Sequence, residues 1–253
     1  MSRASPQVAI TAITLSIVIG LAVLTGCSAI QRKLLFYPSH RTDNNGLTRW
    51  PAEGRLIGYA RIVSAPKNIW LLLHGNGGQA SDRAYAIPSF SPEDSVFILE
   101  YPGYGARNGK PSRESFDAAA VEAYRDLRKQ FPASPICVAG ESIGSGPACM
   151  LATQAVPPDK MVLVVPFDNL KSVATEHVPY LPVGLILGPS WDNVAALSGY
   201  KGPVDIFGAE QDTVIPMHHA EALSRSLPQA QFHKISGGHN DWSRESRVQI
   251  RNP

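Results

Sequence analysis

Short apolar runs alternate with amphipathic segments along most of the chain. The runs in the middle are almost continuously apolar, as expected of β-strands that are covered on both faces. The runs that predict strands are 56–63, 69–73, 96–99, 136–139, 161–165, 204–207 and 231–235. The patterns that predict helices are 115–130, 143–154 and 218–226. This alternation predicts an α/β fold with a doubly wound, mostly parallel sheet.

Residues 166–199 interrupt the alternation. The segment is rich in proline and glycine and includes the apolar residues 183–187 and Trp191. It is long enough for a short helix or two but not for a second domain. The sequence therefore predicts a short insertion at this position.

Composition agrees with a single folded domain. The chain has 253 residues, of which 44% are hydrophobic and 17% are charged. The formal net charge is +2, and the sequence has no long basic run and no interleaving of aromatic with basic residues. Nucleic acid is therefore not expected as a partner.

The N-terminus has the pattern of a secretory signal peptide. A polar start with one cation, Arg3, precedes residues 8–24, which include no charged side chain, and the run ends in Leu24-Thr25-Gly26-Cys27. That tetrad resembles the bacterial lipobox, which implies cleavage after residue 26 and lipidation of Cys27. The alternative is an uncleaved membrane anchor, since the run is only slightly shorter than a span of about 20 residues.

Either interpretation attaches the protein to a membrane. The lipobox implies a signal peptide over 1–26, and the patterns described above divide the remainder into a tether and entry segment over 27–50 and a folded α/β domain over 51–253. It also implies a lipid-anchored protein of the bacterial cell envelope that faces the periplasm or the outside. Several acyl chains give stable attachment, whereas one gives only marginal binding.

A nucleophile motif stands between a predicted strand and a predicted helix. Gly140-Glu141-Ser142-Ile143-Gly144 has the Gly-x-Ser-x-Gly pattern of a nucleophile elbow. The glycines suit a sharp, strained turn that exposes the Ser142 hydroxyl at the start of a helix. Ser142 is therefore the predicted nucleophile.

A second glycine-rich turn, His74-Gly75-Asn76-Gly77-Gly78, follows the strand predicted over 69–73. Backbone N–H groups in such a turn can stabilise developing negative charge. We assign the oxyanion hole to the N–H groups of Asn76 and Ile143, the latter being the residue after the nucleophile. The sequence does not distinguish Asn76 from Gly77. His74, at the strand end, suits a structural hydrogen-bonding role.

A serine nucleophile needs a base and an orienting acid. Of the seven histidines, only His239 lies in a glycine-rich loop after the last predicted strand and also fits the chain order Ser, acid, His. Asp212 lies past a strand end and is the predicted acid. Its rivals are Asp205, Glu210 and Asp168.

The base has to be neutral to accept the serine proton. Activity is therefore expected to fall below about pH 6, where histidine side chains gain a proton. A pH–rate profile measures this directly. A rate that stays constant between about pH 4 and about pH 8 would contradict a histidine base.

The stretch from about Leu35 to Trp242 resembles the α/β-hydrolase superfamily, and is most similar to its compact abhydrolase-domain serine hydrolases. The motifs that support the resemblance are the two glycine turns above, Tyr101-Pro102-Gly103-Tyr104-Gly105, residues 208–212 and Gly237-Gly238-His239. The resemblance implies the α/β-hydrolase fold, with residues 166–199 in place of a full lid and therefore a fairly open active site. One departure is Arg107, where many relatives have a small residue, and we expect it to alter the pocket rim.

The resemblance further implies hydrolysis of acyl esters or thioesters with no cofactor and no metal. The implied partners are an acyl ester or acylated substrate, including membrane lipid. Two alternatives remain open. One is a serine peptidase, which needs a carboxylate such as Glu100, Glu141 or Glu176 to bind the substrate ammonium group. The other is a non-catalytic binding protein with a hydrolase fold.

The three cysteines do not have zinc-type spacing. Cys27 belongs to the lipobox. We expect Cys137 and Cys149 to be buried reduced thiols, because a disulfide between them needs Cα atoms within about 7 Å.

Overall fold

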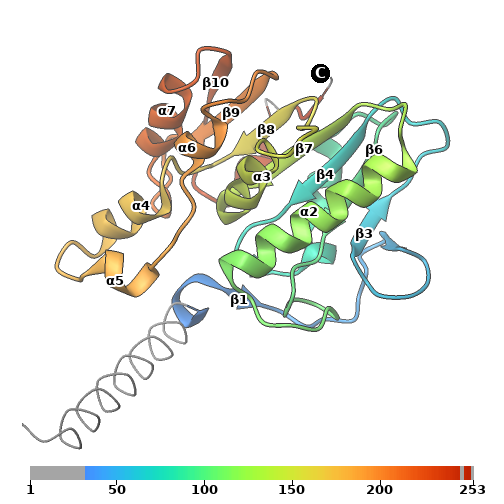
Figure 1. Ribbon diagram of the computed structural model, residues 1–253, viewed down its shortest axis with the longest axis horizontal. Coiled ribbons are helices and arrows are strands. Elements are labelled where there is room, and N and C mark those ends of the chain that lie inside the picture. Colours follow the sequence, from blue (N-terminus) through green and yellow to red (C-terminus); the bar gives the residue numbers. More distant parts are fainter. Residues whose placement is uncertain (1–31, 246–247, 252–253) are drawn as a thin grey trace, which may run out of the picture.

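The computed structural model describes residues 32–245 and 248–251 (Figure 1). Within these ranges the chain forms an eight-stranded sheet of order β10-β9-β8-β7-β4-β6-β3-β2. The strands are β2 (Thr48–Trp50), β3 (Gly58–Arg61), β4 (Ile69–Leu73), β6 (Ser95–Leu99), β7 (Ile136–Glu141), β8 (Met161–Val164), β9 (Val204–Ala209) and β10 (Ala230–Ile235). Strand β3 runs antiparallel to both of its neighbours, β2 and β6, and the other neighbouring strands in this sheet pair in parallel. The predicted α/β fold with a mostly parallel sheet is confirmed.

Helices cover both faces of this sheet. Helices α2 (Arg113–Gln130) and α3 (Ser145–Leu151) cover one face (Figure 1), and the 3-10 helix η1 (Ala80–Ser89) packs on the other. Helix α7 (Met217–Arg225) lies against β9 and β10. Helix α2 begins two residues before its predicted range, after Ser112, whose side chain accepts a hydrogen bond from the Ser115 N–H at 3.1 Å.

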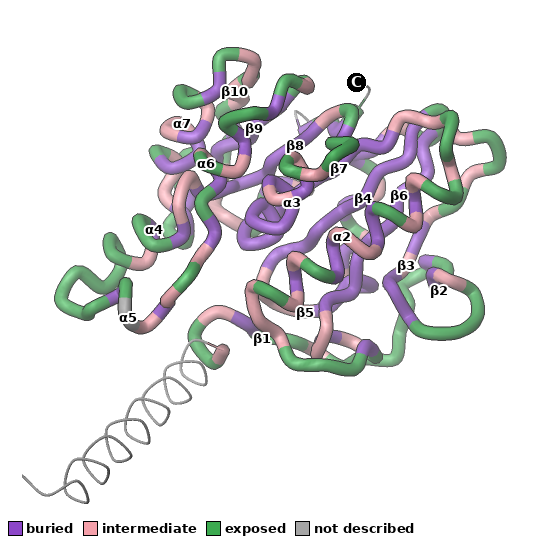
Figure 2. The backbone as a smooth tube through the Cα atoms, viewed as in Figure 1, coloured by how far each residue is buried: buried purple, intermediate pink, exposed green. Residues whose placement is uncertain are grey.

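Strand β4 shows why the central strands are apolar throughout. Ile69, Leu71 and Leu73 pack into the core beneath α2 and α3, whereas Trp70 and Leu72 pack into the core beneath η1. All five side chains are buried, as are most residues of the neighbouring strands (Figure 2). A strand with cores on both faces cannot show the alternation of a half-exposed strand.

The entry segment is folded onto the domain from Phe36 onward. The short strand β1 (Tyr37–Pro38) pairs in parallel with β5 (Gly77–Gly78), and β2 forms one edge of the main sheet. Phe36, Leu47 and Trp50 are buried. The predicted signal peptide over 1–26 and Cys27 lie outside the described residues. No helix among the described residues is long and apolar enough to cross a membrane.

The insertion at 166–199 forms three short helices, one more than the sequence led us to expect. They are α4 (Leu170–His177), α5 (Val183–Leu187) and α6 (Asn193–Leu197). Side chains stabilise two of their N-termini: Asn169 accepts from the Lys171 N–H at 2.9 Å, and Asp192 accepts from the Ala195 N–H at 2.9 Å. These capping hydrogen bonds help to stabilise α4 and α6, whose apolar patterns are too short to predict a helix.

Candidate active site

Ser142 stands in the sharp turn between β7 and α3, at the first position of the 3-10 helix η2 (Ser142–Gly144). Its φ is 54°, a left-handed backbone conformation that costs energy for any residue with a Cβ. The flanking glycines are needed for close packing. A Cβ on Gly144 would lie 2.1 Å from the Leu73 carbonyl oxygen, and one on Gly140 would lie 2.8 Å from Ser145 Cα. The motif therefore forms the elbow that its glycines predict.

His239 contacts both Ser142 and Asp212. Its Nε2 lies 2.8 Å from Ser142 Oγ, and its Nδ1 lies 2.7 Å from Asp212 Oδ2. A carboxylate can only accept, so Nδ1 carries the proton and Nε2 is free to accept the hydrogen of the serine hydroxyl. The structure thus brings together the three residues that the sequence selected from distant parts of the chain.

The loop after β9 fixes the Asp212 carboxylate. Oδ1 accepts hydrogen bonds from the N–H groups of Val214 and Ile215, each at 2.8 Å, which leaves Oδ2 for His239. The side chain is 1% exposed. Both carboxylate oxygens are therefore in use, and Asp212 can orient the imidazole without rotating.

The rival acids have other partners. Asp205 contacts Lys160 and His233, each at 2.8 Å, and Glu210 pairs with Lys234 on the surface. Asp168 lies 2.7 Å from His219. Of the remaining histidines, His40 and His177 bind the carbonyl oxygens of Gly105 and Val214. These rival acids and histidines therefore bind groups other than Ser142, Asp212 and His239.

The glycine turn after β4 lies beside Ser142 and is held in place on both sides of Asn76. The His74 ring binds the Gly75 carbonyl oxygen through Nδ1 at 2.7 Å. The Tyr104 hydroxyl donates to the Asn76 carbonyl oxygen at 2.7 Å, and so does the Tyr37 N–H at 3.0 Å. Because the C=O and N–H of a trans peptide point in opposite directions, these bonds also fix the Asn76 and Gly77 N–H groups. The oxyanion roles of Asn76 and Ile143 stay predictions.

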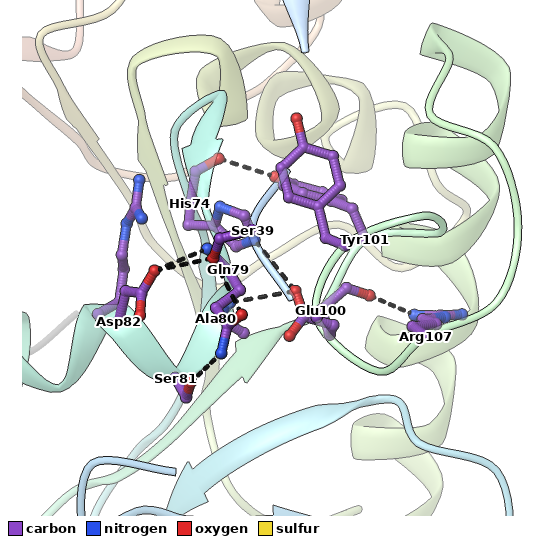
Figure 3. Close-up of polar contacts among 12 residues, drawn as sticks. Ser39, His74, Gln79, Ala80, Ser81, Asp82, Glu100, Tyr101 and Arg107 are labelled. Carbon is purple, nitrogen blue, oxygen red and sulfur yellow. Dashed lines mark hydrogen bonds and ion pairs between the residues drawn. The ribbon is translucent and has the colours of Figure 1, made fainter. Parts of the chain in front are cut away.

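A buried polar network lies behind this turn (Figure 3). The Tyr101 hydroxyl donates to the His74 carbonyl oxygen at 3.2 Å, and the Ala80 N–H donates to Glu100 Oε1 at 3.1 Å. His74 Nε2 lies 3.8 Å from Glu100 Oε1, and both side chains are fully buried. Burial raises the pKa of the Tyr101 hydroxyl, which therefore stays neutral and can donate. His74 is part of the scaffold of the turn, as its place at the strand end suggested.

Arg107 does not form the pocket rim, contrary to our expectation. It is buried and donates to the Glu100 carbonyl oxygen at 2.8 Å (Figure 3). It also pairs with Glu122 at 2.9 Å. Burial and the nearby Arg55 lower the pKa of Arg107 to about 10. The side chain ties the turn after β6 to α2, away from Ser142.

Glu141, the variable residue of the elbow, forms a buried ion pair. Its Oε2 lies 3.0 Å from Arg83 Nε and accepts from the Gly75 N–H at 3.1 Å, while the Tyr85 hydroxyl donates to Oε1 at 3.1 Å. Burial alone would raise the pKa of Glu141, but the Arg83 guanidinium and these donors lower it from 4.5 to about 2. The pair joins the nucleophile elbow to the glycine turn.

Replacing Glu141 with glutamine is expected to lower the free energy of unfolding by about 3 kcal/mol at neutral pH, because Arg83 is left buried without its partner. The pKa of Glu141 is depressed on folding, so its contribution is complete above its ordinary value of 4.5 and is lost as the pH falls toward about 2. Urea unfolding at pH 7 and pH 3 measures the difference.

The matched control for that experiment is Glu93→Gln, which removes an exposed pair with Lys67 and should change stability by less than about 1 kcal/mol. A Glu141→Gln difference that is the same at both pH values would contradict a stabilising role for the ionised pair.

A cavity of about 690 Å³ opens beside Ser142. Four segments of the chain line this cavity, and the described residues of the insertion are not among them. The lining residues are Arg41, Gly75, Asn76, Gly77, Gly78, Asp82, Arg83, Tyr85, Glu141, Ser142, His239, Asn240, Ser243 and Arg244. The lining is therefore rich in polar side chains and includes three arginines, Arg41, Arg83 and Arg244.

None of the three glutamates considered for a peptidase has a free carboxylate in this cavity. Glu141 lines the cavity but is bound by Arg83, Gly75 and Tyr85. Glu100 is buried behind the glycine turn, and Glu176 of α4 contacts His218 and His219 of α7. The requirement for an ammonium-binding carboxylate is not met by these residues.

The cysteines in the described part of the chain are free and buried. Cys137 packs in the core beneath η1, and Cys149 in the core beneath α2 and α3, so they lie on opposite faces of the sheet. Burial raises the pKa of Cys137 to about 12 and also raises that of Cys149. Both are neutral thiols with a packing role.

Comparison with known proteins identifies the family. A model described as the alpha/beta hydrolase family matches residues 70–247. The chain belongs to the α/β-hydrolase family. An uncharacterized protein of Mycobacterium tuberculosis is 29% identical over 94% of this chain and 89% of its own length. Lysophosphatidylserine lipase ABHD12 of Danio rerio is 27% identical over 65% of this chain and 48% of its own, so the aligned region spans about half of that lipase.

Solved structures of α/β-hydrolases have the same fold. An alpha-beta hydrolase of Vibrio vulnificus gives a TM-score of 0.62 at 20% identity, covering 74% of this chain and 71% of that one. An esterase of Pyrococcus furiosus gives a TM-score of 0.60 at 14% identity, covering 83% and 95%. At these identities the likeness concerns the fold alone.

Proposed function

We propose that this α/β-hydrolase is a serine hydrolase that cleaves carboxylic esters or thioesters through an acyl-enzyme. The observation that carries the proposal is the continuous chain of contacts from Ser142 Oγ to His239 and on to Asp212, with distances of 2.8 and 2.7 Å, beside an open cavity. A serine hydroxyl becomes a nucleophile when such a base can take its proton.

The proposed reaction uses these contacts. His239 Nε2 takes the proton as Ser142 Oγ attacks the substrate carbonyl carbon, and Asp212 stabilises the imidazolium that forms. The N–H groups of Asn76 and Ile143 are proposed to bind the oxyanion of the tetrahedral intermediate. His239 then protonates the leaving group, and water attacks the acyl-enzyme by the same route.

The proposed substrate is a lipid ester with an anionic head group. The relatives include proteins named lysophosphatidylserine lipase, whose name specifies such an ester. Three arginines, Arg41, Arg83 and Arg244, line the cavity, and the exposed Arg244 supports the idea. Arg83 is bound to Glu141, and Arg41 to Asp82 at 3.0 Å, whereas the exposed Arg244 reaches the cavity from the 3-10 helix η3 (Trp242–Arg244).

We also propose that Cys27 is lipidated and anchors the enzyme in the bacterial cell envelope. A tether raises the effective concentration of any substrate in the same bilayer. Metabolic labelling with an alkyne fatty acid, compared between the wild type and Cys27→Ser, tests the anchor independently of the chemistry.

The test of the activity uses the full chain in detergent. We would measure labelling by a fluorophosphonate probe and fatty-acid release from lysophosphatidylserine, lysophosphatidylcholine and p-nitrophenyl esters of increasing chain length. Labelling with ester turnover supports the proposal. A folded protein that neither labels nor hydrolyses any ester would be a non-catalytic binding protein, and cleavage of N-terminal residues from peptides alone would make it a peptidase.

Replacing Arg244 with glutamine is expected to raise KM for lysophosphatidylserine by about two- to fivefold. This change corresponds to the free energy that an exposed charge pair contributes. The KM for an uncharged p-nitrophenyl ester should not change, because that substrate has no anionic group. Arg225→Gln, on the exposed face of α7, is the matched control. Equal changes for both substrates would contradict a role for Arg244 in head-group binding.

A further inference from the structure

Three potential metal ligands converge where the insertion meets α7. Glu176 lies in the last turn of α4, and His218 and His219 lie in the first turn of α7. One ligand atom from each side chain lies within 4.8 Å of the others. The shortest contacts join Glu176 Oε2 to His218 Nε2 at 2.9 Å and to His219 Nε2 at 3.1 Å. A single point can therefore be reached by two imidazoles and one carboxylate.

His219 has a carboxylate oxygen at each ring nitrogen. Its Nδ1 lies 2.7 Å from Asp168 Oδ1, and its Nε2 faces Glu176. A carboxylate oxygen can only accept, and a neutral imidazole has one N–H. Two lone pairs therefore face each other at one of the two contacts unless a cation lies there. That cation is either a second proton on His219 or a metal ion bound by the three side chains.

The surroundings favour the metal ion. In metal sites, a ligating histidine commonly donates its other N–H to a carboxylate, which fixes the ring and its tautomer. Asp168 stands in that place, and the His219 side chain is only 5% exposed, so its Nε2 is held toward the other two ligands. Glu176 and His218 are 44% and 55% exposed, which leaves room for water to complete the coordination.

We infer that Glu176, His218 and His219 bind one divalent transition-metal ion, with Asp168 orienting His219. Two imidazoles and a carboxylate are a ligand set that Zn²⁺ accepts, with water as a fourth ligand. The site is separate from Ser142, and the inference does not depend on the proposed hydrolase activity. The ion would join α4 of the insertion to α7.

This joint lies next to the loop of the triad acid. His177, beside Glu176, binds the Val214 carbonyl oxygen at 2.8 Å, and the Val214 N–H binds Asp212. A metal ion between α4 and α7 would thus hold the two elements that flank this loop. Its expected effect is on the stability of the insertion and of the start of α7.

The experiment is a calorimetric titration of the untagged full chain, stripped with a chelator, with ZnCl₂. Co²⁺ titration is followed in parallel by visible absorption, which reports coordination directly. We expect one ion per chain, a tetrahedral Co²⁺ spectrum and a higher Tm with zinc. His218→Ala and Glu176→Gln should lose the binding, and Asp168→Asn should weaken it by about 10- to 100-fold.

The matched control is His233→Ala, which removes a half-exposed histidine that also faces an aspartate, Asp205, at 2.8 Å. It should bind zinc like the wild type, and circular dichroism confirms that each variant is folded. Absence of zinc binding in the wild type would overturn the inference. Zinc binding that persists in both His218→Ala and Glu176→Gln would also overturn it. In either case the three side chains form an ion-pair network with a protonated histidine.

Discussion

Replacing Ser142 with alanine is expected to lower kcat for ester hydrolysis by about 10⁶-fold, the loss seen when the nucleophile of such a triad is removed. His239 and Asp212 remain in contact in the variant, but no atom can form the acyl-enzyme. The residual rate comes from binding and the oxyanion donors alone. The measurement is single-turnover ester hydrolysis together with labelling by a fluorophosphonate probe.

The matched control for Ser142 is Ser243→Ala, because Ser243 lines the same cavity. This variant should label and turn over within about twofold of the wild type, since losing an uncharged surface hydroxyl changes free energies by a few tenths of a kcal/mol. Undiminished labelling of Ser142→Ala would show that another nucleophile carries the reaction.

Replacing Asp212 with asparagine is expected to lower kcat by about 10⁴-fold. Oδ1 already accepts from the Val214 and Ile215 N–H groups, so an asparagine would keep its oxygen there and turn its NH₂ toward His239. His239 Nδ1 would then have to accept a hydrogen bond and Nε2 would carry the proton. In that tautomer the imidazole cannot take the proton of Ser142.

Glu210→Gln is the control for Asp212, since Glu210 was the nearest rival acid and pairs with Lys234 on the surface. Its rate should match the wild type, and the wild-type fold of both variants can be checked by their Tm. A rate for Asp212→Asn within about tenfold of the wild type would show that a different carboxylate orients the base.

The central sheet and the arrangement of the candidate site could be predicted from the sequence, because both depend on local patterns. The apolar runs at β4 and β7 are buried on both faces, and the glycines at 140 and 144 are required by the packing of the turn. His239 and Asp212 were selected by their loop positions and their order in the chain. Apart from the chain order, each of these signals is visible within a few consecutive residues.

The parts that were missed depend on contacts between distant residues. The 3-10 helix η1 includes Pro88 and has no clear apolar face, and it forms where the sheet leaves a hydrophobic surface to cover. Nothing near Glu141 in the sequence indicates that Arg83 would bind it, since the partner is 58 positions away. The burial of Arg107 was missed because the residues around it do not show that it would bind the Glu100 carbonyl oxygen, after β6, and Glu122 of α2, which are 7 and 15 positions away.

The pairing of β1 with β5 makes the entry strand a mechanical element of the active site. Tyr37 and Ser39 donate backbone hydrogen bonds to the carbonyl oxygens of Asn76 and Gly78, at 3.0 and 2.8 Å. Tension applied at the N-terminal end of the domain would first act on the packing of Phe36 and then on these two hydrogen bonds. It would reach the strands of the main sheet only afterwards. In a chain held by that end, a pulling force would disturb the glycine turn before it unfolded the domain, and the rate of catalysis would fall before global stability did.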